Sequence, residues 1–148
     1  MENTEVKSQS VLVSIFRIGD AYFGIDTNNV QEVVKIGKIT PVHNSHSFIV
    51  GVMNLRGKIV SVLDFGLKLD MEKIEENQDN RIYIVNWNDE QVGLLVDEVS
   101  DTVEVEETDL KSIPENVQGK QKRYFSNIFH FHGKLISMVN LDYVLRND

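Results

Sequence analysis

The feature that most constrains the fold of this chain is an internal repeat. Residues 16–25 resemble residues 85–94 at an offset of 69, and residues 57–64 resemble residues 133–140 at an offset of 76. The difference, 76 − 69 = 7, predicts an insertion within residues 111–122. Strands of similar composition can look alike by chance, but here the order, the spacing and the glycines agree together. The sequence therefore predicts two similar units of about 60–70 residues each.

Both halves carry patterns that are typical of short β-strands. Residues 11–18, 58–65, 81–87 and 134–140 are rich in β-branched and aromatic side chains. We predict a mainly β fold of two compact barrels, formed by residues 11–68 and 81–148. Units this small bury too little surface to be stable alone, so we expect the halves to pack on each other as one monomer. The seam between them is then a natural binding groove.

Helical signals are confined to short segments. They are residues 28–33 with Asp26 or Thr27 as cap, residues 106–110, and residues 141–146 with Asn140 as cap. Residues 69–80 form the longest polar, charged stretch, and we expect them to connect the two barrel units.

Composition excludes several classes of function. The net charge of 15 − 23 = −8 disfavours nucleic acid as a partner, because phosphate affinity comes from Lys and Arg. The absence of cysteine excludes disulfides, thiolate zinc sites and cysteine nucleophiles. No apolar run approaches the roughly 18 residues of a membrane span, and residues 1–10 do not have the pattern of a signal peptide. We therefore expect a cytoplasmic protein without direct membrane insertion.

Two groups of residues could suggest catalysis but do not support it. Asp64-Phe65-Gly66 matches a kinase tripeptide, yet the phosphate loop, strand lysine and catalytic loop of a kinase are missing. We expect Asp64 to end a strand and Gly66 to permit the turn after it. The acids between residues 97 and 107 alternate with other residues, as on a solvated face. The sequence therefore predicts no enzyme.

The histidines do not form a convincing metal site. His130 and His132 would point to one side of a strand, and His43 and His46 could add ligands. No carboxylate falls at a suggestive spacing, so we interpret all four as surface or core histidines and predict no metal and no cofactor.

The tetrapeptide Asn54-Leu55-Arg56-Gly57 is the best candidate for a binding site. The second half has residues 130–133 at the same place and keeps only the glycine. A positive-φ turn explains the glycine. Asn54 could bond its own turn and Arg56 could be a solvated tip, but an arginine on a rigid turn is also suited to pairing with a partner carboxylate.

Four segments of the chain resemble the CheW family, the coupling proteins of bacterial chemotaxis. They are residues 16–34, 51–65, 92–105 and 133–145, which together cover most of the chain. The most specific match is Asn-Leu-Arg-Gly followed by a β-branched strand that ends in aspartate. The resemblance implies a single domain over residues 1–148, built from two five-stranded SH3-like barrels with a hydrophobic seam.

The resemblance also implies a function and a site. A CheW-like scaffold is non-catalytic and bridges chemoreceptor cytoplasmic tips, in membrane-associated arrays, to the regulatory domain of the histidine kinase CheA. The implied receptor site comprises Val30, Glu32, Asn54, Leu55, Arg56, Gly57 and Val99, and kinase contact is implied around Gly51. The chain departs from the family pattern at Ser61, where proline is common, and at Phe65-Gly66, where Leu-Arg usually stands.

Two alternatives remain open from the sequence. One is a CheW-like double-barrel scaffold in another two-component pathway. The other is a small β-barrel ligand-binding protein or enzyme, which predicts a polar pocket with a perturbed acid or a bound cofactor.

Overall fold

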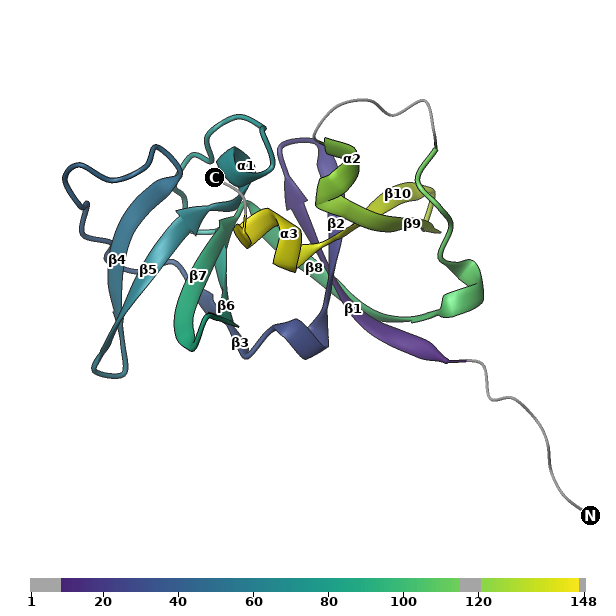
Figure 1. Ribbon diagram of the computed structural model, residues 1–148, viewed down its shortest axis with the longest axis horizontal. Helices are drawn as coiled ribbons and strands as arrows, with labels where there is room; N and C mark the ends of the chain where they lie inside the picture. Colours follow the sequence, from purple (N-terminus) through teal and green to yellow (C-terminus); the bar gives the residue numbers. More distant parts are fainter. Residues whose placement is uncertain (1–8, 115–120, 147–148) are drawn as a thin grey trace, which may run out of the picture.

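The computed structural model describes residues 9–114 and 121–146 as two five-stranded sheets that lie side by side (Figure 1). One, the β1 sheet, has the order β8 (Glu98–Glu106), β1 (Ser10–Ile18), β2 (Ala21–Asp26), β10 (Lys134–Val139), β9 (Phe125–Phe131). The other, the β6 sheet, has the order β3 (Glu32–Lys35), β6 (Arg81–Trp87), β7 (Glu90–Val96), β5 (Lys58–Asp64), β4 (Ile49–Leu55). The predicted mainly β fold with two five-stranded units is confirmed.

The helices of the described residues are short, and two of them, at residues 65–68 and 121–124, lie outside the predicted helical segments. The helices are η1 (Thr27–Asn29), α1 (Phe65–Lys68), η2 (Glu107–Asp109), α2 (Gln121–Tyr124) and α3 (Leu141–Arg146). Asp26 caps η1 and Asn140 caps α3, because their side-chain oxygens accept the N–H groups of Asn28 and Tyr143. The predicted helical turn over residues 28–33 is wrong at its end. Glu32 and Val33 belong to β3, where pairing with β6 supplies the backbone hydrogen bonds.

The repeat in the sequence is also a repeat in the structure. Gly24 lies opposite Ile15 in the β1 sheet, and Gly93, at an offset of 69, lies opposite Ile84 in the β6 sheet. A methyl group on either glycine would come within 2.8 Å of a neighbouring side chain, so close packing of strands keeps both positions small. The offset of 76 carries the β4–β5 hairpin onto the β9–β10 hairpin, including the register irregularity within each.

The predicted division into residues 11–68 and 81–148 as separate barrels is wrong. The β1–β2 hairpin pairs with β8 and β10 of the second half, whereas the β6–β7 hairpin pairs with β3 and β5 of the first half. Each sheet therefore combines a hairpin from one half with three strands from the other. The two halves thus exchange hairpins, since outside the hairpin itself each one is hydrogen-bonded to strands of the other half.

The two sheets share one hydrophobic core. Phe16 and Ile25 from the β1 sheet pack in the same cluster as Val62, Tyr83 and Leu94 from the β6 sheet. A second, smaller cluster belongs to the β1 sheet alone. Residues 69–80 contain no helix or strand, but they are not a free linker, because Leu69, Ile74 and Asn80 are buried.

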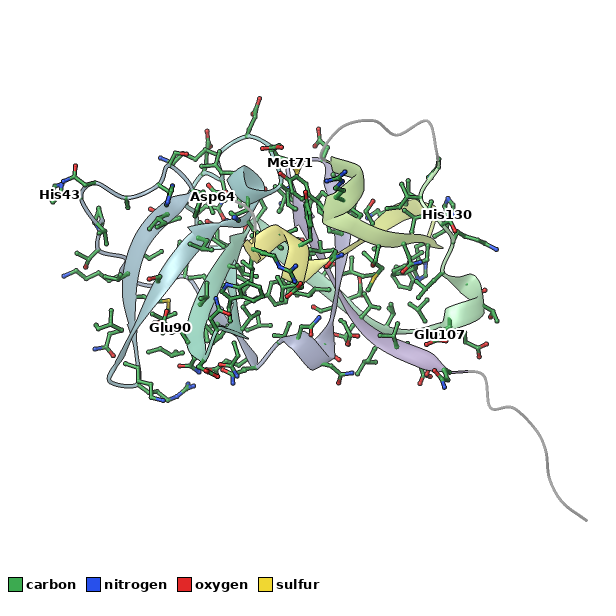
Figure 2. All side chains as sticks on the ribbon, in the orientation of Figure 1. His43, Asp64, Met71, Glu90, Glu107 and His130 are labelled. Carbon is green, nitrogen blue, oxygen red and sulfur yellow. The ribbon has the colours of Figure 1, made fainter. Side chains whose placement is uncertain are left out.

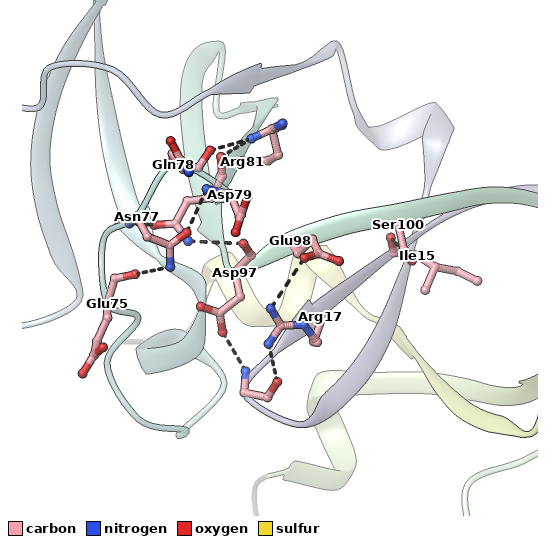
Figure 3. A network of polar contacts seen from close by, with 12 residues as sticks. Ile15, Arg17, Glu75, Asn77, Gln78, Asp79, Arg81, Asp97, Glu98 and Ser100 are labelled. Atoms are coloured by element: carbon pink, nitrogen blue, oxygen red, sulfur yellow. Dashed lines mark hydrogen bonds and ion pairs between the residues drawn. The ribbon is translucent and has the colours of Figure 1, made fainter.

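A polar network fixes the crossing from the β6 sheet to the β1 sheet (Figure 3). The Asp97 carboxylate accepts the Gly19 N–H at 2.7 Å, and the Asp97 carbonyl accepts the buried Asn80 amide at 3.2 Å. Arg17 forms an ion pair with Glu98 across 3.8 Å. Asp97 thus has a structural role, which differs from the solvated acidic face expected there. No helix of the described residues is long and apolar enough to span a membrane.

Candidate functional site

The β4–β5 hairpin turns through only two residues, Arg56 and Gly57. Their φ angles are +50° and +86°, and the equivalent residues of the β9–β10 hairpin, His132 and Gly133, have +49° and +77°. This turn type matches the twist of the flanking strands and needs positive φ at both positions. The predicted positive φ at Gly57 is confirmed. The Asn54 side chain accepts the Gly57 N–H at 2.8 Å, so Asn54 closes its own turn.

Arg56 forms an ion pair with Glu32, the first residue of β3. Two guanidinium nitrogens donate to the two carboxylate oxygens, one of them at 3.3 Å. The Glu32 carboxylate, first by hydrogen bonding and then by its charge, raises the pKa of Arg56. The Arg56 side chain is 68% exposed and that of Glu32 is 32% exposed. A fixed, charged guanidinium is therefore presented to solvent, with some of its five N–H donors still available.

The fold explains why residues so far apart meet here. β3 and β4 are the opposite edges of the β6 sheet. The chain that follows β3 returns to β4, where Thr40 and Val52 form a bridge with two hydrogen bonds of 2.8 Å. This path brings the start of β3 next to the β4–β5 turn.

The other predicted receptor residues lie in or against the core. Leu55 is buried, with 9% exposure. Val30 and Val99 are half-buried against the shared core, and they occupy equivalent positions of the repeat, each in a segment that crosses between the sheets. Of the predicted set, the structure thus joins Glu32 to Arg56 by direct contact and places Val30 and Val99 against the same core.

Gly51, predicted near the kinase contact, is held by the backbone around it. It has φ +155° and sits at the register irregularity of β4. A Cβ atom there would lie 2.2 Å from the Thr40 carbonyl oxygen. Close approach of two backbone segments therefore accounts for the glycine itself.

The seam carries a cleft of about 680 Å³, but it lies elsewhere than the residues predicted for the groove. Its walls include Gln31, Trp87, Asn127 and Asn140, from both sheets. The sequence predicts a groove at the seam but not these lining residues, since they are single side chains scattered over strand ends and loops. The one available signal is that Trp87 is the only tryptophan of the chain.

The residues that could suggest catalysis or metal binding do not come together at one site. His43 and His130 lie at opposite ends of the molecule (Figure 2). The described residues contain no group of three or more acidic or histidine side chains arranged to hold a metal. Asp64 ends β5 and caps α1 by accepting the Leu67 N–H at 3.0 Å, as predicted for a structural residue. Gly66 lies inside α1, where a Cβ atom would be 2.7 Å from the Glu72 carbonyl oxygen.

A family model described as CheW-like domain matches residues 13–148. Among curated proteins, the chain is similar to "Chemotaxis protein CheW" of Rhizobium meliloti, at 29% identity over 90% of this chain and 86% of the relative. It is also similar to the protein of the same name from Bacillus subtilis, at 29% identity over 95% of this chain and 90% of the relative.

The fold is similar to a solved structure. The crystal structure of the scaffolding protein TtCheW from Thermoanaerobacter tengcongensis superposes with a TM-score of 0.83, at 28% sequence identity over 95% of both chains.

Proposed function

Since this chain belongs to the family of CheW-like domains, we propose that its Glu32–Arg56 pair is the contact through which it holds a chemoreceptor tip. The family makes the chain a non-catalytic scaffolding protein of chemotaxis signalling. On this proposal it works in the cytoplasm at receptor arrays, with the histidine kinase CheA as its second partner.

The observation that carries the proposal is that the Arg56 side chain is exposed and is oriented by Glu32. Gly57 serves the positive φ of the turn and Asn54 accepts its N–H, but the turn does not need a guanidinium, since the equivalent turn has His132 in that place. Glu32 orients the guanidinium and leaves N–H donors that can receive a carboxylate from the partner. The fold thus does not require arginine at position 56, and the remaining N–H donors of the guanidinium can bind a partner.

The remaining residues of the proposed receptor site support the Glu32–Arg56 pair. Asn54, Leu55 and Gly57 shape the turn, while Val30 and Val99 offer half-buried apolar surface at the two crossings. For the kinase, we propose the surface around Gly51 on β4, an edge strand of the β6 sheet. These roles place the two partners on different residues.

Substitution of Arg56 tests the receptor contact. We expect Arg56→Ala to weaken binding of a receptor-tip fragment by about tenfold or more, because a partner carboxylate is then left unpaired. Glu32→Gln should weaken it less, since the guanidinium keeps its charge but loses its orientation. Both variants are titrated by calorimetry against the receptor fragment and, separately, against the CheA regulatory domain.

The control is Arg17→Ala, which removes a half-buried arginine that also pairs with a glutamate. It should leave receptor binding unchanged. Equal losses for Arg17→Ala and Arg56→Ala, or a large fall in melting temperature for Arg56→Ala, would show that the Arg56 side chain is not a specific receptor contact.

A further inference from the structure

The acid of the Glu32–Arg56 pair has a counterpart in the second half of the chain. Glu32 of β3 lies opposite Ile84 of β6. Its equivalent is Asp101 of β8, at 101 − 32 = 69, which lies opposite Ile15 of β1, at 84 − 15 = 69 from Ile84. This match in register shows that the two acids occupy the same place in the two sheets.

The arginine has a counterpart as well, but one of different chemistry. His132 follows Arg56 at the repeat offset, 132 − 56 = 76, and the two turns have the same conformation there, with φ +49° and +50°. The His132 ring packs edge-on against the Phe131 ring, with 4.1 Å between the ring centroids. Asp101 forms no side-chain hydrogen bond or ion pair with the other residues that the structure describes, whereas Glu32 is held by Arg56. The second half thus keeps the acid and lacks the guanidinium.

A pocket of about 310 Å³ lies between Asp101 and the β9–β10 turn. Ile15 and Ile136 form its apolar floor, with 2% and 0% exposure. Tyr22 and Lys134 also line it, and the Lys134 Nζ atom lies 4.1 Å from the centre of the Tyr22 ring. The pocket therefore offers apolar surface for methylene groups beside one carboxylate that has no partner within the described part of the chain.

Shorter side chains explain why this place is open in the second half. In the first half, Gln91 donates to Gln31 across 2.7 Å, so two long amides bridge β7 and the segment before β3. The equivalent of Gln31 is Ser100, at 100 − 31 = 69, which is too short to form such a bridge and donates to the Ile15 carbonyl at 3.3 Å. The acid beside it is aspartate instead of glutamate, one methylene group shorter. The space that long side chains fill in the first half is thus available to a ligand in the second.

The charges around the pocket indicate what kind of group fits. Glu98, which also lines it, is already paired with Arg17 (Figure 3), so Asp101 is the carboxylate left for a partner. A guanidinium matches a carboxylate through two parallel hydrogen bonds and stacks on aromatic rings, which an ammonium does not. The net charge of −8 attracts basic partners in general. The exposed acids of β8 add to this attraction and are Glu98, Asp101, Glu104 and Glu106.

We propose that this pocket, here called the Asp101 pocket, accepts an arginine side chain of a partner protein. The guanidinium pairs with Asp101 as Arg56 pairs with Glu32, and the methylene groups of the arginine cover Ile15 and Ile136. The partner thereby supplies the group that the first half supplies from its own turn. The Asp101 pocket shares no residue with the Glu32–Arg56 contact, so the two proposals stand or fall separately.

A peptide titration followed by amide spectra of the isotope-labelled full chain tests the proposal. The probe is the capped tripeptide Ala-Arg-Ala at millimolar concentrations, and we expect saturable shifts of the amide signals around the pocket. The same tripeptide with citrulline has nearly the same shape but no charge, and it should bind at least about fivefold more weakly. A tripeptide with lysine keeps the charge but loses the paired hydrogen bonds, so its affinity should lie between the two.

Variants of the protein test the role of the acid. Asp101→Asn keeps the size of the side chain and removes its charge, so the affinity for the arginine peptide should fall by about fivefold or more. Glu106→Gln is the matched control, because it removes the same charge from the same strand at an exposed position that does not line the pocket. It should leave peptide binding unchanged. His132→Arg places a guanidinium on the turn, as Arg56 does in the first half, and should abolish peptide binding by occupying the pocket.

Several results would overturn the proposal. They are the absence of saturable shifts, equal binding of the arginine and citrulline peptides, and equal affinities of Asp101→Asn and Glu106→Gln. Inorganic phosphate that shifts the same amides, and binds more tightly to Asp101→Asn, would show instead that the pocket selects anions through His132 and Lys134. Amide signals around the pocket that shift with protein concentration alone would assign it to a second copy of the chain.

Discussion

Ser14 and Tyr83 are separated by the repeat offset of 69 residues, and their hydroxyl groups meet at 2.8 Å inside the molecule. Both residues are buried, with 5% and 0% exposure. Burial raises the pKa of the Tyr83 hydroxyl, so this group stays protonated. Because positions 14 and 83 are equivalent in the two repeats, this contact lies where the two halves of the molecule meet.

Ser14→Ala should therefore destabilise the fold by about 1–3 kcal/mol, because the Tyr83 hydroxyl is left buried without a partner. The double variant Ser14→Ala with Tyr83→Phe should be less destabilised than the sum of the two single variants. Urea unfolding of all four proteins gives the coupling free energy. Additive losses would show that the two hydroxyls do not depend on each other.

At the residue scale the sequence predicts local roles better than distant contacts. Asn140 as a cap and Gly57 at positive φ follow from neighbouring residues, and both are confirmed. The Glu32–Arg56 pair depends on opposite edges of a curved sheet meeting, and no local pattern contains that information. The Asn54 hydrogen bond to its own turn was an open alternative that only the geometry decides.

Asp64 joins three elements, because it ends β5, caps α1 and anchors the segment that carries Ile74. In Asp64→Asn the side-chain oxygen can still cap α1, as Asn140 does in α3. The amide nitrogen then faces the Ile74 N–H, so two donors oppose each other. We expect a loss of about 1–3 kcal/mol in unfolding free energy, measured by urea denaturation at acid pH.

The same variant has a pH dependence with a definite sign. Burial, opposed by backbone hydrogen bonds from Ile74 and Leu67, raises the pKa of Asp64 above its ordinary 3.8. Between 3.8 and the folded-state pKa, the native protein binds more protons at Asp64 than the unfolded chain does, so native stability falls as pH rises. Asparagine does not titrate. The stability difference between wild type and Asp64→Asn should therefore be larger at about pH 3 than at about pH 7. A difference that grows towards neutral pH would mean that the folded pKa of Asp64 is lowered.

Elements with strong local patterns are well predicted. Residues 81–87 form β6 as expected, and residues 134–139 of the predicted 134–140 form β10. β3 was missed because Glu32 and Lys35 give its four residues a weak strand pattern, and pairing with β6 decides its conformation. The predicted segment 106–110 shortens to a single turn, η2, for which Glu106 makes no side-chain cap.

At the scale of the whole molecule, the exchange of hairpins predicts how a fragment behaves. A chain of residues 1–72 keeps β1 and β2 but loses β8 and β10, the described strands with which this hairpin pairs. It also loses β6 and β7, which lie between β3 and β5 in the β6 sheet. We expect this fragment to lack a cooperative thermal transition, whereas the full chain unfolds in one step as a monomer.

Circular dichroism and amide proton spectra of the fragment provide the measurement. A sharp melting transition with dispersed amide signals would show that the first half folds without the second. The repeat in the sequence could not predict this arrangement. The repeat identifies which strands are equivalent. It does not tell which copy of a hairpin pairs with a given set of strands, because either copy could form the same backbone hydrogen bonds, and only tertiary packing decides between the two.

The exchange of hairpins also has a consequence during synthesis on the ribosome. β2 ends at Asp26 and β8 ends at Glu106, so 106 − 26 = 80 residues are added before the next partner of the first hairpin is complete. At about 5–20 residues per second, the hairpin waits about 4–16 seconds for β8 to be made, and longer for β10. Throughout this time the apolar faces of β1 and β2 are open to chaperones and to neighbouring nascent chains.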